Sequence, residues 1–65
     1  MKREKYTAKN LAFIADDYIR IIRIIGEKQP SGCMYHNLSI DYPDMKLEDA
    51  SIIVSLLRKE GVIHD

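Results

Sequence analysis

The 65-residue sequence has a single cysteine, no tryptophan, two prolines and three glycines. Because Cys33 has no second cysteine to pair with, an internal disulfide is excluded. The spacing of Cys33 and His36, with His64 further along, imitates part of a zinc site, but a structural site needs four ligands. A buried cysteine and surface histidines are the simpler interpretation. We expect no metal and no other cofactor.

Long apolar runs and an excess of one charge are also missing. No apolar run approaches the ~20 residues that span a bilayer, and residues 1–5 do not lead into an apolar signal sequence. We therefore expect a cytoplasmic protein with no membrane partner. Ten basic and ten acidic residues leave no net charge, which disfavours DNA binding driven by charge alone. Residues 1–28 hold seven bases and four acids, whereas residues 29–65 hold three and six.

The usual sequence signatures of catalysis are missing as well. The chain contains no nucleophile elbow, no glycine-rich phosphate loop and no helix motif with paired metal ligands. A chain of this length also has little room for a desolvated pocket in which pKa values could be tuned. We do not expect an enzyme.

What the sequence does contain is a periodic pattern of isoleucine and leucine that predicts one helical domain over residues 1–65. A first helix is expected from Ala8 to Glu27, with Thr7 as its N-cap. Charged pairs Asp16–Arg20 and Arg23–Glu27 mark its solvent face. The residues expected on its core face are Leu11, Ile14, Ala15, Tyr18, Ile21, Ile22 and Ile25.

Residues 29–32 are expected to break the pattern, because they include a proline and a glycine. A short second helix is then expected from Cys33 to Ile40, although a brief strand from Gly32 to Met34 also fits. After a turn at residues 41–44, a third helix is expected from Met45 to Glu60 with Asp44 as its N-cap. Gly61 ends that helix, and residues 62–64 are expected to form a short strand. The core stripe expected on the third helix comprises Leu47, Ala50, Ile53, Val54 and Leu57.

Both long helices carry more apolar side chains than one packing face needs. On the first helix the additional residues are Phe13 and Ile24, and on the third they are Ile52 and Leu56. One interpretation is that the connecting segments fold over and bury them. The other is that they form an interface, and a symmetric homodimer is the commonest way to cover such residues.

The order of these elements resembles the helix-turn-helix core of small winged-helix regulators. The resemblance rests on Pro-Ser-Gly-x-x-Tyr-x-x-Leu at Pro30 to Leu38 and on Leu-Leu-Arg-Lys-Glu-Gly-Val-Ile at Leu56 to Ile63. It implies a mainly α fold, with a three-helix helix-turn-helix core, a short C-terminal strand and a wing truncated at Asp65. It also implies a DNA-binding transcriptional regulator whose third helix approaches double-stranded DNA.

The DNA contacts that the resemblance implies on the third helix are Lys46, Ser51, Ser55, Arg58 and Lys59. Residues 1–7 form a basic N-terminal arm that could lie along phosphates through Lys2, Arg3 and Lys5. Acidic residues, however, stand near the start of the third helix, where such proteins use arginine or amide side chains. The alternative function is a protein-protein interaction module that docks on another regulator or assembly without binding DNA. DNA binding requires the cations to form one positive surface, whereas a protein partner would use the apolar patches.

Overall fold

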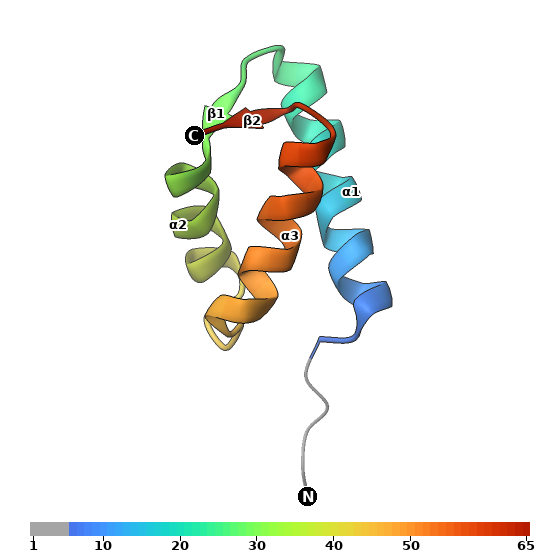
Figure 1. Cartoon of the computed structure of the whole chain (residues 1–65), viewed down its shortest axis with the longest axis vertical. Coiled ribbons are helices and arrows are strands. Elements are labelled where there is room, and N and C mark those ends of the chain that lie inside the picture. Colours follow the sequence, from blue (N-terminus) through green and yellow to red (C-terminus); the bar gives the residue numbers. More distant parts are fainter. Residues whose placement is uncertain (1–5) are drawn as a thin grey trace, which may run out of the picture.

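The computed structural model describes residues 6–65, which form three helices and one pair of short strands. In chain order the elements are α1 (Ala8–Ile25), β1 (Gln29–Pro30), α2 (Ser31–Asp41), α3 (Leu47–Lys59) and β2 (Ile63–His64). Helix α3 lies between α1 and α2, and the strands lie at the end of the molecule where α1 ends and α2 begins (Figure 1). The expected mainly α fold, with a three-helix core and a short C-terminal strand, is confirmed. None of the helices within residues 6–65 is long and apolar enough to cross a membrane.

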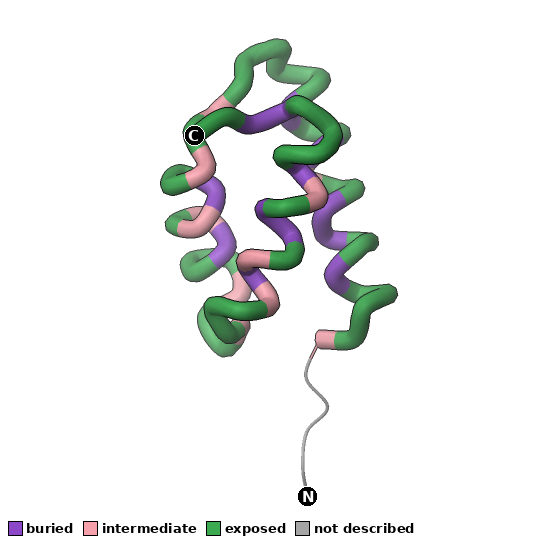
Figure 2. The backbone as a smooth tube through the Cα atoms, in the orientation of Figure 1, coloured by how far each residue is buried: buried purple, intermediate pink, exposed green. Residues whose placement is uncertain are grey.

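A single apolar core joins the three helices and β2, and α3 contributes its centre. Three side chains of this helix, Ile53, Val54 and Leu57, are completely buried, and Met34 and Leu38 of α2 pack beside them. The buried stretches of the three helices face one another across the molecule (Figure 2). The remaining core residues are Leu11, Ile14, Ala15, Ile19, Ile22, Ala50, Val62 and Ile63.

Helix α1 begins as expected and ends two residues early. The Thr7 hydroxyl accepts from the Asn10 backbone N–H at 3.1 Å, and the Asn10 side-chain oxygen accepts from the Thr7 N–H at 3.4 Å. This reciprocal cap satisfies two first-turn donors. At the other end Gly26 adopts a left-handed conformation, with φ 80°, and its N–H donates to the Ile22 carbonyl at 2.8 Å. Because glycine adopts this conformation without strain, the helix stops at Ile25.

The early end of α1 changes its ion pairs. Glu27 lies outside the helix and therefore is not one turn from Arg23, which instead bonds Glu60 at the end of α3 at 2.9 Å. Arg20 pairs with Asp17 at 4.0 Å rather than with Asp16. The two expected i,i+4 pairs of α1 are therefore wrong, and one of their replacements ties α1 to α3.

The buried face of α1 is also narrower than expected. Ile21 and Ile25 are 45 % and 57 % exposed, whereas Ile19, which the expected core face omitted, is buried. The physical reason is that α1 packs chiefly along one helix, α3, so that a single stripe suffices to make the contact. Two isoleucines on the far edge of the expected face are left in solvent.

The segment expected to break the chain at residues 29–32 is instead a strand followed directly by α2. Gln29 pairs with Ile63 and Pro30 with His64 in a parallel arrangement. Pro30 lacks a backbone N–H, which is tolerated at the edge of so short a sheet, and its fixed φ suits the residue before a helix. The alternative strand at residues 32–34 does not form, because these residues belong to α2.

Asp65 fastens this strand pair to both neighbouring helices. One of its carboxylate oxygens, Oδ1, accepts from the Ser31 hydroxyl at 2.9 Å and from Arg58 Nη2 at 2.8 Å. These two interactions, the serine hydrogen bond first, hold the pKa of the Asp65 carboxyl below its usual range. The start of α2, the end of α3 and the residue after β2 thus meet at one side chain.

Helix α3 begins at Leu47, two residues after the expected start. Asp44 does not cap it, because its carboxylate accepts from the Tyr6 hydroxyl at 2.9 Å. Lys46 occupies the N-cap position and makes no side-chain cap. As a result Leu47, expected in the core stripe, stands at the helix end and is 73 % exposed. The other four residues of that stripe are buried, as expected.

Tyr18 links α1 to α2 through a hydrogen bond from its hydroxyl to Asp41 Oδ2, at 2.5 Å. Burial raises the pKa of this phenol far above its ordinary value, and the bond to Asp41 raises it further. A raised pKa means that the folded state keeps a proton which the unfolded state loses. The stability that Tyr18 contributes is therefore complete below pH about 10 and declines as the pH rises further.

Replacing Tyr18 by phenylalanine is expected to cost about 1 kcal/mol of unfolding free energy at about pH 8, because Asp41 loses its donor. The loss should shrink as the pH rises above about 10, where the wild-type phenol is penalised and the variant has none to titrate. Urea denaturation of wild type and variant at about pH 8, and again above about pH 10, measures the loss of unfolding free energy and its decrease with pH. Tyr35→Phe is the matched control, since it removes a different hydroxyl and retains Tyr18. Equal pH slopes for wild type and Tyr18→Phe would contradict the assignment.

Candidate interaction surfaces

The cations expected to contact DNA do not form one surface on α3. Lys46 lies at the start of the helix, while Arg58 and Lys59 lie in its last turn. At 1.5 Å per residue the two ends are about 18 Å apart. The three basic residues of the arm, Lys2, Arg3 and Lys5, fall outside the described residues.

The polar side chains expected at the DNA interface differ in how available they are. Arg58 donates through both Nε and Nη2 to Asp65, at 3.1 and 2.8 Å, so its charge is locally neutralised. Ser51 is partly buried, and its Oγ lies 3.4 Å from the Tyr35 hydroxyl, which donates to it. Ser55 and Lys59 are exposed.

The α3 outer face, opposite the core, consists of Glu48, Ile52, Ser55 and Lys59. The helical repeat of 100° per residue places these four within one arc, with the acid and the base balancing each other. Over residues 31–60 as a whole there are three bases and five acids. The potential at this face is therefore not the strongly positive one that phosphates select.

The apolar residues expected at an interface fall into two groups. Phe13 and Ile24 are 73 % and 79 % exposed on α1, and Ile52 is about half exposed on α3. Leu56 differs, because it is partly buried and packs against the core. It lines a groove between α1 and α3 with Ala12, Ala15, Asp16, Ile19, Lys59 and Glu60. Ile52 and Leu56 therefore differ in their surroundings, since the first is exposed and the second is partly buried.

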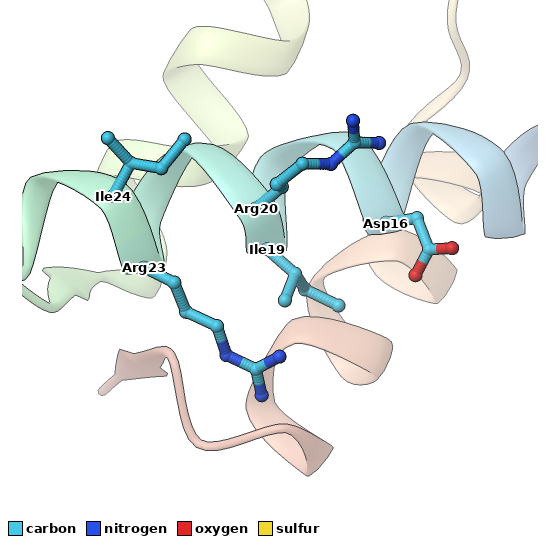
Figure 3. A pocket seen from close by; sticks show the side chains of 5 residues that line it. All are labelled: Asp16, Ile19, Arg20, Arg23 and Ile24. Carbon is cyan, nitrogen blue, oxygen red and sulfur yellow. The ribbon is translucent and has the colours of Figure 1, made fainter.

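Helix α1 carries four of the seven large apolar side chains that are exposed among the described residues, Phe13, Ile21, Ile24 and Ile25. We define the α1 outer strip as Phe13, Asp17, Arg20, Ile21 and Ile24. Figure 3 shows that Arg20 and Ile24 point to one side of the helix, whereas Ile19 and Arg23 point toward α3 and the segment after it. Between these two rows lies an open surface hollow. The strip thus faces away from the helix that α1 packs against.

The residues considered as metal ligands are not gathered together. Cys33 is exposed rather than buried as expected, and its sulfur lies 3.9 Å from the Asn37 side-chain nitrogen. Within residues 6–65, no three His, Cys, Asp or Glu side chains are grouped so that they could hold a metal ion.

Comparison of this chain with known protein families, with curated proteins and with solved structures found no match. The class defined by the described residues is therefore structural: a small mainly α domain of three helices, closed at one end by a two-residue parallel strand pair. Its distinctive surface is the α1 outer strip. The helical repeat placed Phe13 and Ile24 of this strip outside the core face. It placed Ile21 on the core face, and its exposure was missed because the sequence does not reveal how many helices pack on α1.

Proposed function

We propose that the chain is a protein-interaction module that binds a protein partner through the α1 outer strip. The observation that carries the proposal is the exposure of Phe13 and Ile24, at 73 % and 79 %, on one line of a helix. Exposed apolar side chains gathered on one face are typical of protein interfaces, and aromatic residues are common anchors there. Asp17 and Arg20 between them supply a polar pair that fixes orientation rather than strength.

The distribution of charge supports a protein partner over DNA. Affinity for duplex DNA comes largely from cations that displace counterions from phosphates. On α3 the two acids of the first turn, Glu48 and Asp49, lie beside Lys46, and Arg58 is held by Asp65. Among the described residues of α3 and its N-cap, the exposed cations outside any ion pair are Lys46 and Lys59, at opposite ends of the helix.

DNA binding remains the second candidate, and one observation favours it. Helix α3 follows α2 after a short turn and exposes Ser55 and Lys59 on the side opposite the core. This is the arrangement in which the second helix of a helix-turn-helix enters the major groove. In that case the basic arm at residues 1–7 would add phosphate contacts.

A titration of the protein with a mixed-sequence duplex at about 50 and about 200 mM salt separates the two functions. For a protein-interaction module we expect no discrete complex in an electrophoretic shift at the higher salt concentration, and no effect of Lys59→Ala. A DNA-binding module would form a complex whose salt slope falls by about one unit in Lys59→Ala, because one phosphate contact is removed. That second result would overturn the proposed function. Lys59 is preferred to Arg58 for this test because Arg58 also holds Asp65.

A further inference from the structure

The α1 outer strip has a symmetric arrangement of side chains. Phe13 and Ile24 are eleven residues apart in the same helix. Eleven residues make three full turns plus about 20° around the helix axis, so the two side chains project in nearly the same direction, about 16 Å apart along the helix. Between them, and on the same side, lie Asp17 and Arg20, whose side chains are 58 % and 67 % exposed. An aromatic residue and an isoleucine thus stand at the two ends, with an acid and a base at the centre.

We propose that the partner of this strip is a second copy of the chain, whose α1 packs antiparallel against the first. The inference rests on the proposed function and names its partner. The two-fold axis then passes beside α1, level with the point halfway between Tyr18 and Ile19. In this register Phe13 faces Ile24 of the second copy, and Asp17 faces Arg20 of the second copy. A two-fold interface requires this reciprocity, since each residue must contact the one that contacts it.

The pairs brought together in this register are chemically complementary. Phe13 of each copy meets Ile24 of the other, so the same apolar contact forms at both ends of the helix pair. Asp17 meets Arg20 of the second copy twice at the centre, in place of the weak 4.0 Å pair that they form within one helix. Ile21, at the edge of the strip, adds apolar surface beside the central pairs.

Charge also selects the antiparallel direction. The acids of α1, Asp16 and Asp17, precede the two bases in its second half, Arg20 and Arg23, while Lys9 stands in the first turn, outside the pairs of this register. A parallel pair in the same register would place acid against acid and base against base, which is destabilising. The antiparallel pair places opposite charges together and also opposes the helix dipoles favourably.

The strip has one acid and one base, and therefore offers little to a strongly charged partner. Its occupation by a second copy would leave the α3 outer face open, because α3 packs on the other side of α1. One helix pair covers less than the ~800 Å² per partner of a standard interface. We therefore expect a reversible dimer with a dissociation constant on the order of 10 µM.

Sedimentation of the purified chain over a concentration range from about 1 to about 500 µM tests the proposal. We expect a monomer-dimer equilibrium in the wild type. Asp17→Arg and Arg20→Asp should each weaken the homodimer about tenfold, since like charges then face each other in both central pairs. Mixing these two variants should restore a dimer, because each central pair again joins an acid to a base. The weakening of each homodimer distinguishes the antiparallel register, because in a parallel pair like charges already face each other in the wild type and neither reversal would weaken it.

Two further variants complete the experiment. The double substitution Phe13→Ser with Ile24→Ser should leave a folded monomer, because both side chains are exposed. Ile40→Ser is the matched control, since Ile40 is 61 % exposed on α2 and outside the strip, and should dimerise as the wild type does. Circular dichroism of every variant verifies that the helices are retained.

A wild-type chain that stays monomeric throughout the range would overturn the second copy as partner. A dimer that the charge reversals do not weaken, or that mixing does not restore, would also overturn it. Neither result affects the proposed function, which fails instead if the duplex titration gives a complex sensitive to Lys59. The two proposals can therefore fail separately.

Discussion

Replacing Leu57 by alanine is expected to lower the free energy of unfolding by about 3 kcal/mol, the largest effect of any single truncation proposed for this chain. Leu57 is completely buried near the C-terminal end of α3, where it packs into the core shared by the three helices and β2. Removing its side chain loses the transfer energy of the apolar atoms and leaves a cavity that close-packed neighbours cannot fill. A domain of this size has only about 3–5 kcal/mol in total, so most of the stability would be lost.

Urea denaturation followed by the helical circular dichroism signal measures this loss. Ile52→Ala is the control, because Ile52 lies on the same helix with its side chain about half exposed. We expect it to cost less than about 1 kcal/mol. Equal losses for the two variants would show that α3 does not present the face described here to the core.

Leu56→Glu is expected to destabilise the domain by about 2–3 kcal/mol, although Leu56 is not fully buried. Its side chain packs against the core in the groove between α1 and α3, near Ala12 and Ile19. A carboxylate there would lose part of its hydration without a hydrogen-bond partner. It would also stand beside the acids Asp16 and Glu60, which line the same groove.

Thermal melting of Leu56→Glu and Ile52→Glu compares the same charge at two neighbouring positions of one helix. The first should melt well below the wild type, and the second should melt close to it, because Ile52 faces solvent. If both variants were as stable as the wild type, Leu56 would lie on a free surface. In that case it would again be a candidate for an interface residue.

The sequence by itself determined the number, order and type of the helices. The spacing of Leu11, Ile14 and Ile22 in α1, and of Ala50, Ile53, Val54 and Leu57 in α3, marks faces that any packing partner would bury. Thr7 acts through its own local chemistry, as a hydroxyl that accepts from a first-turn backbone N–H. Helical spacing and capping depend only on residues within one or two turns along the chain, so both can be predicted from the sequence.

Only the tertiary structure decided which of several eligible residues each contact uses. Asp44 had the chemistry of a helix cap, but Tyr6, thirty-eight residues away, takes its carboxylate. Arg23 reaches Glu60 rather than Glu27 because α3 ends close to it. The pairing of Gln29 with Ile63 likewise joins segments that have no local signal for each other.

The same distinction applies to the surfaces. Exposure of Phe13 and Ile24 follows from the helical repeat, whereas the fates of Ile21 and Leu56 depend on where neighbouring helices lie. A helix wheel gives the angle of each side chain, but the width of the buried stripe is set by how many elements pack on the helix and where. For α1 that element is chiefly α3, which buries one stripe, leaves Ile21 in solvent and draws Leu56 into the groove between the two helices.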